Sequence, residues 1–183
     1  FSKENSEEQV LKSWEGLGDY SRARNLHKLA RQVDSWKTIP EDAESWQALP
    51  GIGPYVAAAV TSISFGRLEA VCDGNVVRVL TRLFAHGELF KDGASAQRKL
   101  RPLASDLLDT RRPGDYNQAM MELGALVCSP NSPDCKRCPV STLCQAYLLG
   151  DPESFPKKKP KKKAVSIREV AAFAQRHDGT FLM

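Results

Sequence analysis

Four of the five cysteines stand close together, with the spacing C-x6-C-x2-C-x5-C, at Cys128, Cys135, Cys138 and Cys144. Thiolates at this density bind metal, and ligand clustering in a reducing compartment is a better interpretation than a secreted disulfide framework. Structural zinc usually takes two close pairs of cysteines, and only one C-x2-C pair is found here. An iron–sulfur cluster accepts uneven spacing, because its ligands sit at the corners of a wider cube. The spacing therefore favours iron–sulfur by a small margin and leaves zinc open.

Two basic residues, Lys136 and Arg137, lie between the second and third of these cysteines. A loop held by metal keeps both side chains facing outward, where they can meet phosphate groups. A solvated basic pair is the simpler alternative. The fifth cysteine, Cys72, follows Ala70 and Val71, and these apolar neighbours predict a buried thiol.

A glycine-rich turn, LPGIGP, occupies Leu49 to Pro54. Gly51 and Gly53, separated by Ile52, let the backbone turn sharply and bring amide groups to the surface at the start of a helix. Such a helix start attracts phosphate through its free donors and its dipole. The setting between two helices is typical of a helix-hairpin-helix that holds a DNA backbone without reading bases, although an ordinary turn also fits.

A carboxylate, Asp73, stands with Gly74 and Asn75 directly before another helical segment. In one interpretation Asp73 or Asn75 caps that helix. In the other, Asp73 faces a DNA groove and stabilises positive charge that develops on a deoxyribose during glycoside cleavage. The sequence alone does not choose between these two roles.

Helices must position these groups, because apolar residues recur at spacings of three and four and no convincing strand is found before residue 160. The expected helices cover 6–15, 21–33, a short segment after Pro40 that ends near 49, then 55–65, 76–83, 95–109 and 115–127. Ser6 and Gln9 form the capping box of the first helix, Gly66 ends the fourth, and Asp115 caps the last.

The helix after Asp73 has a predicted buried stripe of apolar residues. The stripe consists of Val76, Val79, Leu80 and Leu83. Arg78 and Arg82 are expected on another side of this helix.

The net charge is +4, from 26 Lys and Arg against 22 Asp and Glu. Six lysines belong to 157–163 (KKKPKKK), and without them 20 basic residues face 22 acidic ones, a balance of −2. Net charge alone therefore does not argue for nucleic acid. Residues 149–164 are expected to form a Lys- and Pro-rich linker, and alternation with a turn over 165–183 predicts the first hairpin of a second domain.

Apolar stretches such as Val56 to Val60 are much shorter than the roughly 20 residues that cross a bilayer, so no membrane span is expected. The chain begins at Phe1, and it ends at Met183 inside an unfinished pattern. Both ends are therefore expected to be cut, and a missing start would hide any leader.

Four features together resemble the endonuclease III superfamily of DNA glycosylases over about Val10 to Leu148. They are LPGIGPYVAAAV, VCDGNVVRVLTRLFA, YNQAMMELGALVC and the cysteine spacing. The resemblance implies an all-α, two-lobed helix-hairpin-helix body over residues 1–148, with its N-terminal part missing. It also implies a [4Fe-4S] cluster on the four cysteines of the 128–144 loop, a hairpin at Gly51 to Gly53, and a catalytic Asp73. The hairpin after the linker looks like the start of a truncated, β-containing Nudix-like domain.

The match is closest to the adenine-specific mismatch branch of that superfamily. Its bifunctional lyases carry a Lys two residues after the second hairpin glycine to form a Schiff base, and this position is Tyr55 here. In the adenine-specific branch the Tyr and Asn that match Tyr55 and Asn75 lie beside the reacting nucleotide. The implied reaction is hydrolysis of the glycosidic bond of a flipped-out adenine mispaired with 8-oxoguanine or guanine, with Asp73 stabilising the cationic sugar.

Two departures from the family pattern stand out. The family's general acid is a Glu in an upstream helix, and none of Glu7, Glu8 and Glu15 lies in that motif. This piece alone is therefore expected to have little activity. The family's wedge motif is Gly-Leu-Gly-Tyr-Tyr, whereas residues 16–20 here are GLGDY. Asp19 cannot stack between bases, which leaves Tyr20 as the candidate for that contact.

The expected partner is double-stranded DNA with an adenine mispair, bound by a monomer in the cytoplasm, at the bacterial nucleoid. Two alternatives remain. One is an endonuclease III-like pyrimidine glycosylase with lyase action, against which Tyr55 argues. The other is a DNA-binding relative that has lost catalysis, which Asp19 favours.

Overall fold

The structure, a computed structural model, describes residues 5–157 and 176–178, and within these ranges it is helical and contains no strand. The expectation of a mainly helical body is therefore confirmed. The α-helices are α1 (Glu7–Ser13), α2 (Tyr20–Val33), α3 (Ala43–Gln47), α4 (Pro54–Phe65), α5 (Gly74–Leu83), α6 (Gly93–Asp106), α7 (Pro113–Glu122) and α8 (Gln145–Leu148). A π-helical turn over Leu123–Val127 continues α7, and short 3₁₀ turns cover Ser141–Leu143 and Pro152–Ser154. None of the described helices is both long and apolar enough to span a bilayer.

Local capping explains where most of these helices begin and end. Ser6 and Gln9 form the predicted capping box of α1, and Gly66 ends α4 in the left-handed conformation. The prediction that Asp115 caps α7 is wrong, because this helix begins at Pro113, which suits a first helical position. Asp115 lies in the first turn instead and pairs with Arg112 at 3.0 Å between Nε and Oδ2.

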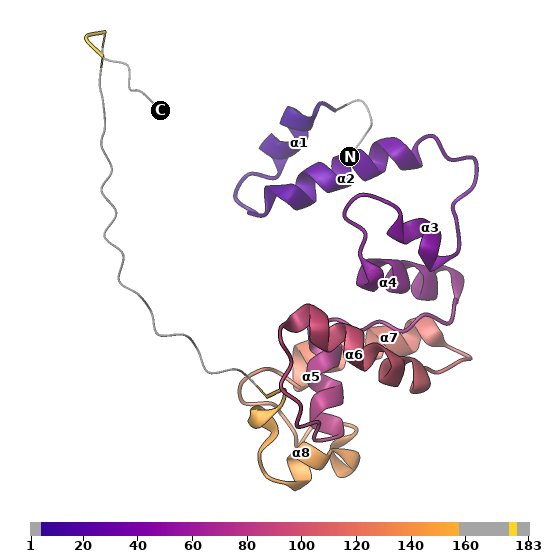
Figure 1. The fold of residues 1–183 in the computed structure, drawn as a ribbon, viewed down its shortest axis with the longest axis vertical. Coiled ribbons are helices and arrows are strands. Elements are labelled where there is room, and N and C mark those ends of the chain that lie inside the picture. Colours follow the sequence, from indigo (N-terminus) through magenta and orange to yellow (C-terminus); the bar gives the residue numbers. More distant parts are fainter. Residues whose placement is uncertain (1–4, 158–175, 179–183) are drawn as a thin grey trace.

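Helices α1 and α2 lie at one end of the molecule and α8 at the other, with the remaining helices between them (Figure 1). α1 packs against α2 at one end, α3 packs against α4, and α4 leads through α7 to a group formed by α5, α6 and α8. Helix α5 is central in this group, because it contacts α6, α7, the π-helical turn and α8. Asp73 and the cysteine loop thus depend on the same helix for support.

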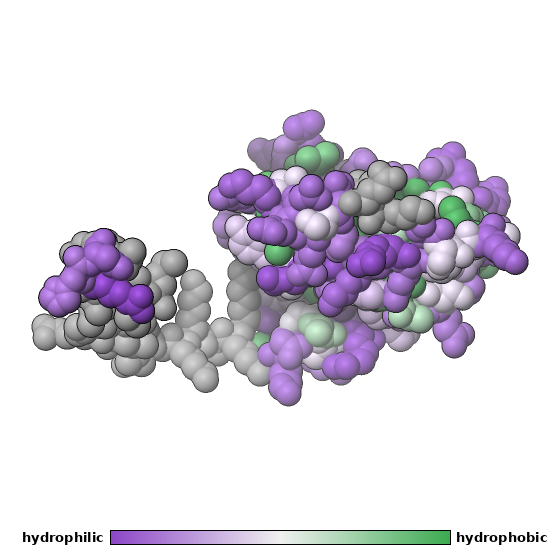
Figure 2. Space-filling view, turned by 90° about the horizontal axis from the view of Figure 1, so that it is seen from above, coloured by the Kyte–Doolittle hydropathy of each residue, from purple (hydrophilic) through white to green (hydrophobic). Residues whose placement is uncertain are grey.

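The core is built around the apolar side of α5. Its fully buried side chains include Val76 and Leu80, which pack with Leu100 of α6 and with Val71 and Cys72 before α5. The predicted stripe is confirmed at Val76, Val79 and Leu80, and the prediction of a buried Cys72 thiol is also confirmed. The face in Figure 2 is largely hydrophilic, with hydrophobic residues in small separate groups.

A buried asparagine, Asn117 of α7, fixes the segment that leads to Asp73. Its Oδ1 accepts a hydrogen bond from the Val71 amide at 3.1 Å, and its Nδ2 donates to the Glu69 carbonyl at 2.7 Å and to Ser62 Oγ at 2.8 Å. Since Asn117 is only 2% exposed, these bonds are shielded from water. One side chain therefore joins α4, α7 and the approach to α5.

Residues 155–157, which were expected to belong to a linker, pack against the helical body. Phe155 is 8% exposed, its carbonyl accepts a hydrogen bond from Arg82 Nε, and Lys157 forms an isolated bridge with Leu89. The rest of the expected linker and most of the expected hairpin over 165–183 lie outside the described residues. His177 and Asp178 of that hairpin are described, and they lie in a turn.

Replacing Asn117 by Ala is expected to lower the free energy of unfolding by about 2–4 kcal/mol, because the Val71 amide and the Glu69 carbonyl both lose their partner in a buried setting. Urea unfolding of the two proteins measures this. Gln118→Ala, at the next and exposed position of α7, is the matched control and is expected to change stability by less than about 0.5 kcal/mol. Equal effects of the two substitutions would contradict the role of Asn117.

Candidate functional site

Asp73 stands at the N-terminus of α5, with both carboxylate oxygens engaged. Oδ1 accepts a hydrogen bond from the Val76 amide at 2.8 Å, and Oδ2 accepts one from Asn75 Nδ2 at 3.2 Å. The capping role considered for Asp73 is therefore present in the structure. A carboxylate has about four acceptor positions, so these two bonds leave capacity for a further partner. The side chain is half-buried and remains reachable.

Asn75 is in turn held by Arg78. Arg78 Nη2 donates to Asn75 Oδ1 and to the Gly124 carbonyl, both at 2.8 Å, and Nε donates to the Cys128 carbonyl at 2.7 Å. Burial lowers the pKa of Arg78, and the neighbouring Cys128 opposes that shift. One guanidinium therefore joins the Asp73–Asn75 pair to the π-helical turn and to the first cysteine of the loop.

Gly124 allows this close approach. A Cβ atom at position 124 would lie 2.6 Å from Asn75 Cβ, which is closer than real side chains pack. The absence of a side chain at Gly124 lets the π-helical turn rest directly on the start of α5. π-helical turns of this kind are frequent at functional sites.

Tyr55 approaches the same turn from α4. Its hydroxyl donates to Met121 Sδ at 3.6 Å, and Met121 stands three residues before Gly124 on α7. Tyr55 is 38% exposed. Tyr55 therefore contacts the end of α7, while Asn75, which bonds Asp73, packs against the π-helical turn that continues α7.

Arg82 is buried, which the sequence pattern did not predict. It was expected only on another side of α5 from the apolar stripe, and it is 2% exposed. Nη1 donates to the Ser129 carbonyl at 2.7 Å and to Cys128 Sγ at 3.3 Å, and Nη2 donates to the Pro130 carbonyl at 2.9 Å. An arginine at helical spacing from Arg78 was the available signal, but its partners lie about 46 positions away in the chain.

The four cysteines line one cavity, together with Arg82 and Tyr147. Within the described ranges, no group of three or more such side chains stands close enough to hold a single metal ion. Burial raises the pKa values of Cys135 and Cys138, and the neighbouring thiols raise them further. Four thiolates can share such a cavity only if positive charge compensates them. Four cysteines that line one cavity are a donor set that an iron–sulfur cluster uses.

Lys136 and Arg137 are both exposed on the cysteine loop, as predicted. Arg137 Nη1 lies 3.6 Å from Asp134 Oδ2, so part of its charge is offset within the loop. Lys136 has no ion pair in the part of the chain that the structure describes. Of the two, Lys136 is the freer to meet a phosphate.

The glycine-rich turn lies against α2. Gly51 has a positive φ of 77°, and a Cβ there would lie 2.6 Å from Asn25 Cβ, so both the turn and its packing require glycine. Gly53 then precedes α4, and Pro54 occupies its first position. The first amides of α4 have no partners within the helix, which gives residues 51–53 the geometry expected of a phosphate-binding hairpin.

The loop before α2 is rigid and presents apolar groups outward. Gly16, Gly18 and Asp19 all have positive φ values, and Trp14 Nε1 donates to the Gly18 carbonyl at 3.0 Å. Tyr20 is 43% exposed and Leu17 is 64% exposed. Leu17 is a candidate contact that the sequence interpretation missed, although its two flanking glycines were the signal.

Asp19 is partly neutralised in this loop. A hydrogen bond from Ser21 lowers the pKa of Asp19, and Arg22 lowers it further, with Nε 2.9 Å from Oδ2. The carboxylate is therefore charged at neutral pH and paired with a cation. This pairing weakens the repulsion from phosphate that the acidic residue implies.

Solved structures with the same fold define the class of protein. The chain superposes on a thermostable thymine-DNA glycosylase with a TM-score of 0.65 and 30% identity, covering 79% of this chain and 67% of that one. A non-covalent endonuclease III–DNA complex matches with a TM-score of 0.64 and 25% identity, over 78% of this chain and 66% of that one. The fold and the hairpin are thus those of the helix-hairpin-helix DNA glycosylases.

Curated relatives narrow the assignment. The adenine DNA glycosylase of Schizosaccharomyces pombe is 43% identical over 143 residues, 76% of this chain and 31% of that protein. The human one is 49% identical over 144 residues, 76% of this chain and 26% of that protein. The chain therefore belongs to the adenine DNA glycosylase family, and it spans about a quarter to a third of these relatives. No protein-family model matches it.

Replacing Arg82 by Lys is expected to destabilise the protein by about 2–4 kcal/mol, because an ammonium cannot serve the carbonyls of Ser129, Pro130 and Phe155 together. Urea unfolding measures the loss, and metal analysis reports the state of the cysteine loop. Arg22→Lys, at an exposed position, is the control and is expected to be nearly neutral. Unchanged stability and metal content in the Arg82 variant would refute its role in holding the loop.

Proposed function

We propose that this chain is the catalytic body of a monofunctional base-excision repair enzyme that hydrolyses the N-glycosidic bond of adenine mispaired with 8-oxoguanine or guanine. The observation that carries the proposal is the Asp73 carboxylate at the start of α5, which is held by Asn75 and by the Val76 amide and keeps acceptor capacity for a further partner. Tyr55, on the helix that follows the glycine-rich turn, supports it. The similarity to adenine DNA glycosylases supports the choice of base.

Asp73 is proposed to stabilise the cationic sugar. The enzyme extrudes the adenine nucleotide from the duplex, and protonation of the base makes it a leaving group. As the bond to C1′ breaks, positive charge develops on the deoxyribose, and a fixed carboxylate lowers the energy of that state. Asn75, itself held by Arg78, keeps the Asp73 carboxylate in place. Water then attacks C1′ and completes the hydrolysis.

Tyr55 supports hydrolysis rather than strand cleavage by a lyase. A lyase of this superfamily needs an amine here to form a Schiff base with C1′ of the sugar, and a phenol cannot do so. The hydroxyl of Tyr55 instead contacts Met121 at the site wall.

Double-stranded DNA is the proposed partner, bound by a monomer. The hairpin over residues 51–53 holds one strand by its phosphates, and Lys136 adds a contact from the cysteine loop. Leu17 lies in the loop before α2 and Tyr20 is the first residue of α2, and both are proposed to wedge into the base stack beside the extruded nucleotide. These contacts position the duplex without reading its sequence.

Cys128, Cys135, Cys138 and Cys144 are proposed to hold a [4Fe-4S] cluster. When bound, the cluster fixes the loop that carries Lys136, and no step of the hydrolysis runs through it. Arg82 supplies a hydrogen bond to Cys128 Sγ. A brown protein that absorbs near 400 nm is the expected sign, whereas a colourless protein with stoichiometric zinc would contradict it.

Asp73→Asn is expected to reduce adenine release from an A:8-oxoguanine duplex by at least about 100-fold, because the sugar cation loses its counter-charge. The fold is expected to survive, since Asn is a good N-cap and can still accept from the Val76 amide. Single-turnover release at enzyme excess measures the effect, with both proteins joined to the upstream segment of the fission yeast relative so that release is fast enough to compare. The matched control is Asp92→Asn, which changes the N-cap of α6 in the same way. Release unchanged by Asp73→Asn would reject the mechanism.

The adenine-release assay can distinguish the glycosylase from the two alternatives, a lyase and a non-catalytic relative. For this purpose a chimera is made, in which the chain is joined to the segment that precedes the matched region in the fission yeast relative. This chimera is proposed to gain the general acid and to release adenine faster than the chain alone. Borohydride is expected to trap no covalent DNA adduct, and trapping would indicate the lyase instead. Duplex binding without base release from the chimera would indicate a non-catalytic relative.

A further inference from the structure

A surface groove lies between the start of α4 and one side of α6. One wall consists of Gln47 at the end of α3, Gly53, and residues 54–56 at the start of α4. The other wall, on α6, consists of Ala94, Gln97, Arg98 and Arg101. Positions 94, 97, 98 and 101 fall on one face of a helix, so the whole face turns toward the groove. Ala94 takes little space, and the longer side chains border the opening.

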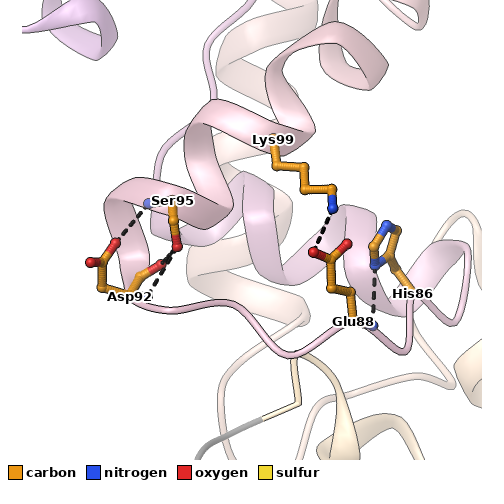
Figure 3. A network of polar contacts seen from close by, with 5 residues as sticks. All are labelled: His86, Glu88, Asp92, Ser95 and Lys99. Atoms are coloured by element: carbon orange, nitrogen blue, oxygen red, sulfur yellow. Dashed lines mark hydrogen bonds and ion pairs between the residues drawn. The ribbon is translucent and has the colours of Figure 1, made fainter.

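The polar contacts around the start of α6 involve none of the residues that line the groove (Figure 3). Asp92 and Ser95 form the capping box of α6, and Lys99 pairs with Glu88 in the preceding loop, where the Glu88 amide donates to His86. These contacts hold the helix and its approach in place. Lys99 takes part in these contacts, whereas Arg98 and Arg101, which face the groove, do not.

The groove is cationic, and no carboxylate lines it. Neither Arg98 nor Arg101 has an ion pair among residues 5–157 and 176–178. Arg98 lowers the pKa of Asp92 through its charge, but no ion pair joins the two side chains among the described residues. Two guanidinium groups that take part in no ion pair there, next to the neutral donors of Gln47 and Gln97, suit an extended anion.

The groove adjoins the proposed reaction site. Tyr55 belongs to its wall, and Gly53 of the hairpin lies beside it. Burial raises the pKa of Cys72 to about 11, and the charge of Arg101 opposes this rise, so Arg101 lies near the residue that precedes Asp73. An anion in the groove would therefore continue directly from one held at the hairpin.

We propose that this groove binds the phosphodiester backbone of the DNA strand, with Arg98 and Arg101 contacting phosphates next to those held by the hairpin. The proposal rests on the proposed function, because it needs a duplex at the hairpin. It extends the DNA contact surface to α6, a helix that carries no catalytic residue. Both contacts are to phosphate, so they add affinity without sequence preference.

The test measures duplex binding by fluorescence anisotropy across a range of salt concentrations, for undamaged and for A:8-oxoguanine duplexes. Removal of one arginine–phosphate interaction should reduce the slope of log K against log salt by about 0.9. At 0.1 M salt this corresponds to roughly eightfold weaker binding per arginine for Arg98→Ala and Arg101→Ala, and to more for the double variant. The reduction in affinity should be equal on both duplexes.

Lys99→Ala is the matched control, since it removes the same charge from the same helix outside the groove, and its salt slope should not change. A double variant with Lys at both groove positions retains the charges and should keep most of the binding, which separates charge from folding. An unchanged slope in the Ala variants, or weaker binding of the mismatched duplex alone, would overturn the groove assignment while leaving the enzyme assignment intact. Failure of the unaltered protein to bind any duplex would instead overturn both.

Discussion

Two guanidinium groups on α5 hold Asp73, Asn75 and the cysteine loop together. Arg78 connects Asn75, and through it Asp73, to the carbonyls of Gly124 and Cys128. Arg82, one turn further on, binds the loop carbonyls that follow Cys128 and the carbonyl of Phe155. Because α5 carries Asp73 at its start, the position of that carboxylate depends on a loop more than 50 residues further along the chain.

This arrangement is stable only as a unit. A buried guanidinium without acceptors is very unfavourable, and the loop carbonyls without a donor are also unfavourable. Arg82 and the segments at Ser129, Pro130 and Phe155 must therefore fold together. Any change that opens the cysteine loop also frees Arg78 from the Cys128 carbonyl. The cysteine loop and the position of Asp73 are thus coupled by hydrogen bonds rather than by direct contact.

The sequence could predict what depends on near neighbours. The capping box at Ser6, the end of α4 at Gly66 and the buried stripe from Val76 to Leu80 all follow from residues within one or two turns. The sequence did not predict those features that depend on a segment far away in the chain. The sequence pattern contained no sign that Arg82 is buried, because only a loop from elsewhere in the chain makes its burial favourable. The close approaches at Gly51 and Gly124 likewise need partners, Asn25 and Asn75, that no local pattern reveals.

The placement of individual charges, rather than their sum, explains how a protein with little net charge can offer a cationic surface to a phosphate backbone. Without the lysine run the chain has 20 basic and 22 acidic residues, so total charge does not attract a polyanion. Many arginines are already used: Arg22, Arg24, Arg67 and Arg112 pair with carboxylates, and Arg78 and Arg82 bind carbonyls. Cations without such partners, as in the α6 groove, contribute to the field at the surface out of proportion to their number. Local placement, and not composition, therefore determines where a phosphate backbone can lie.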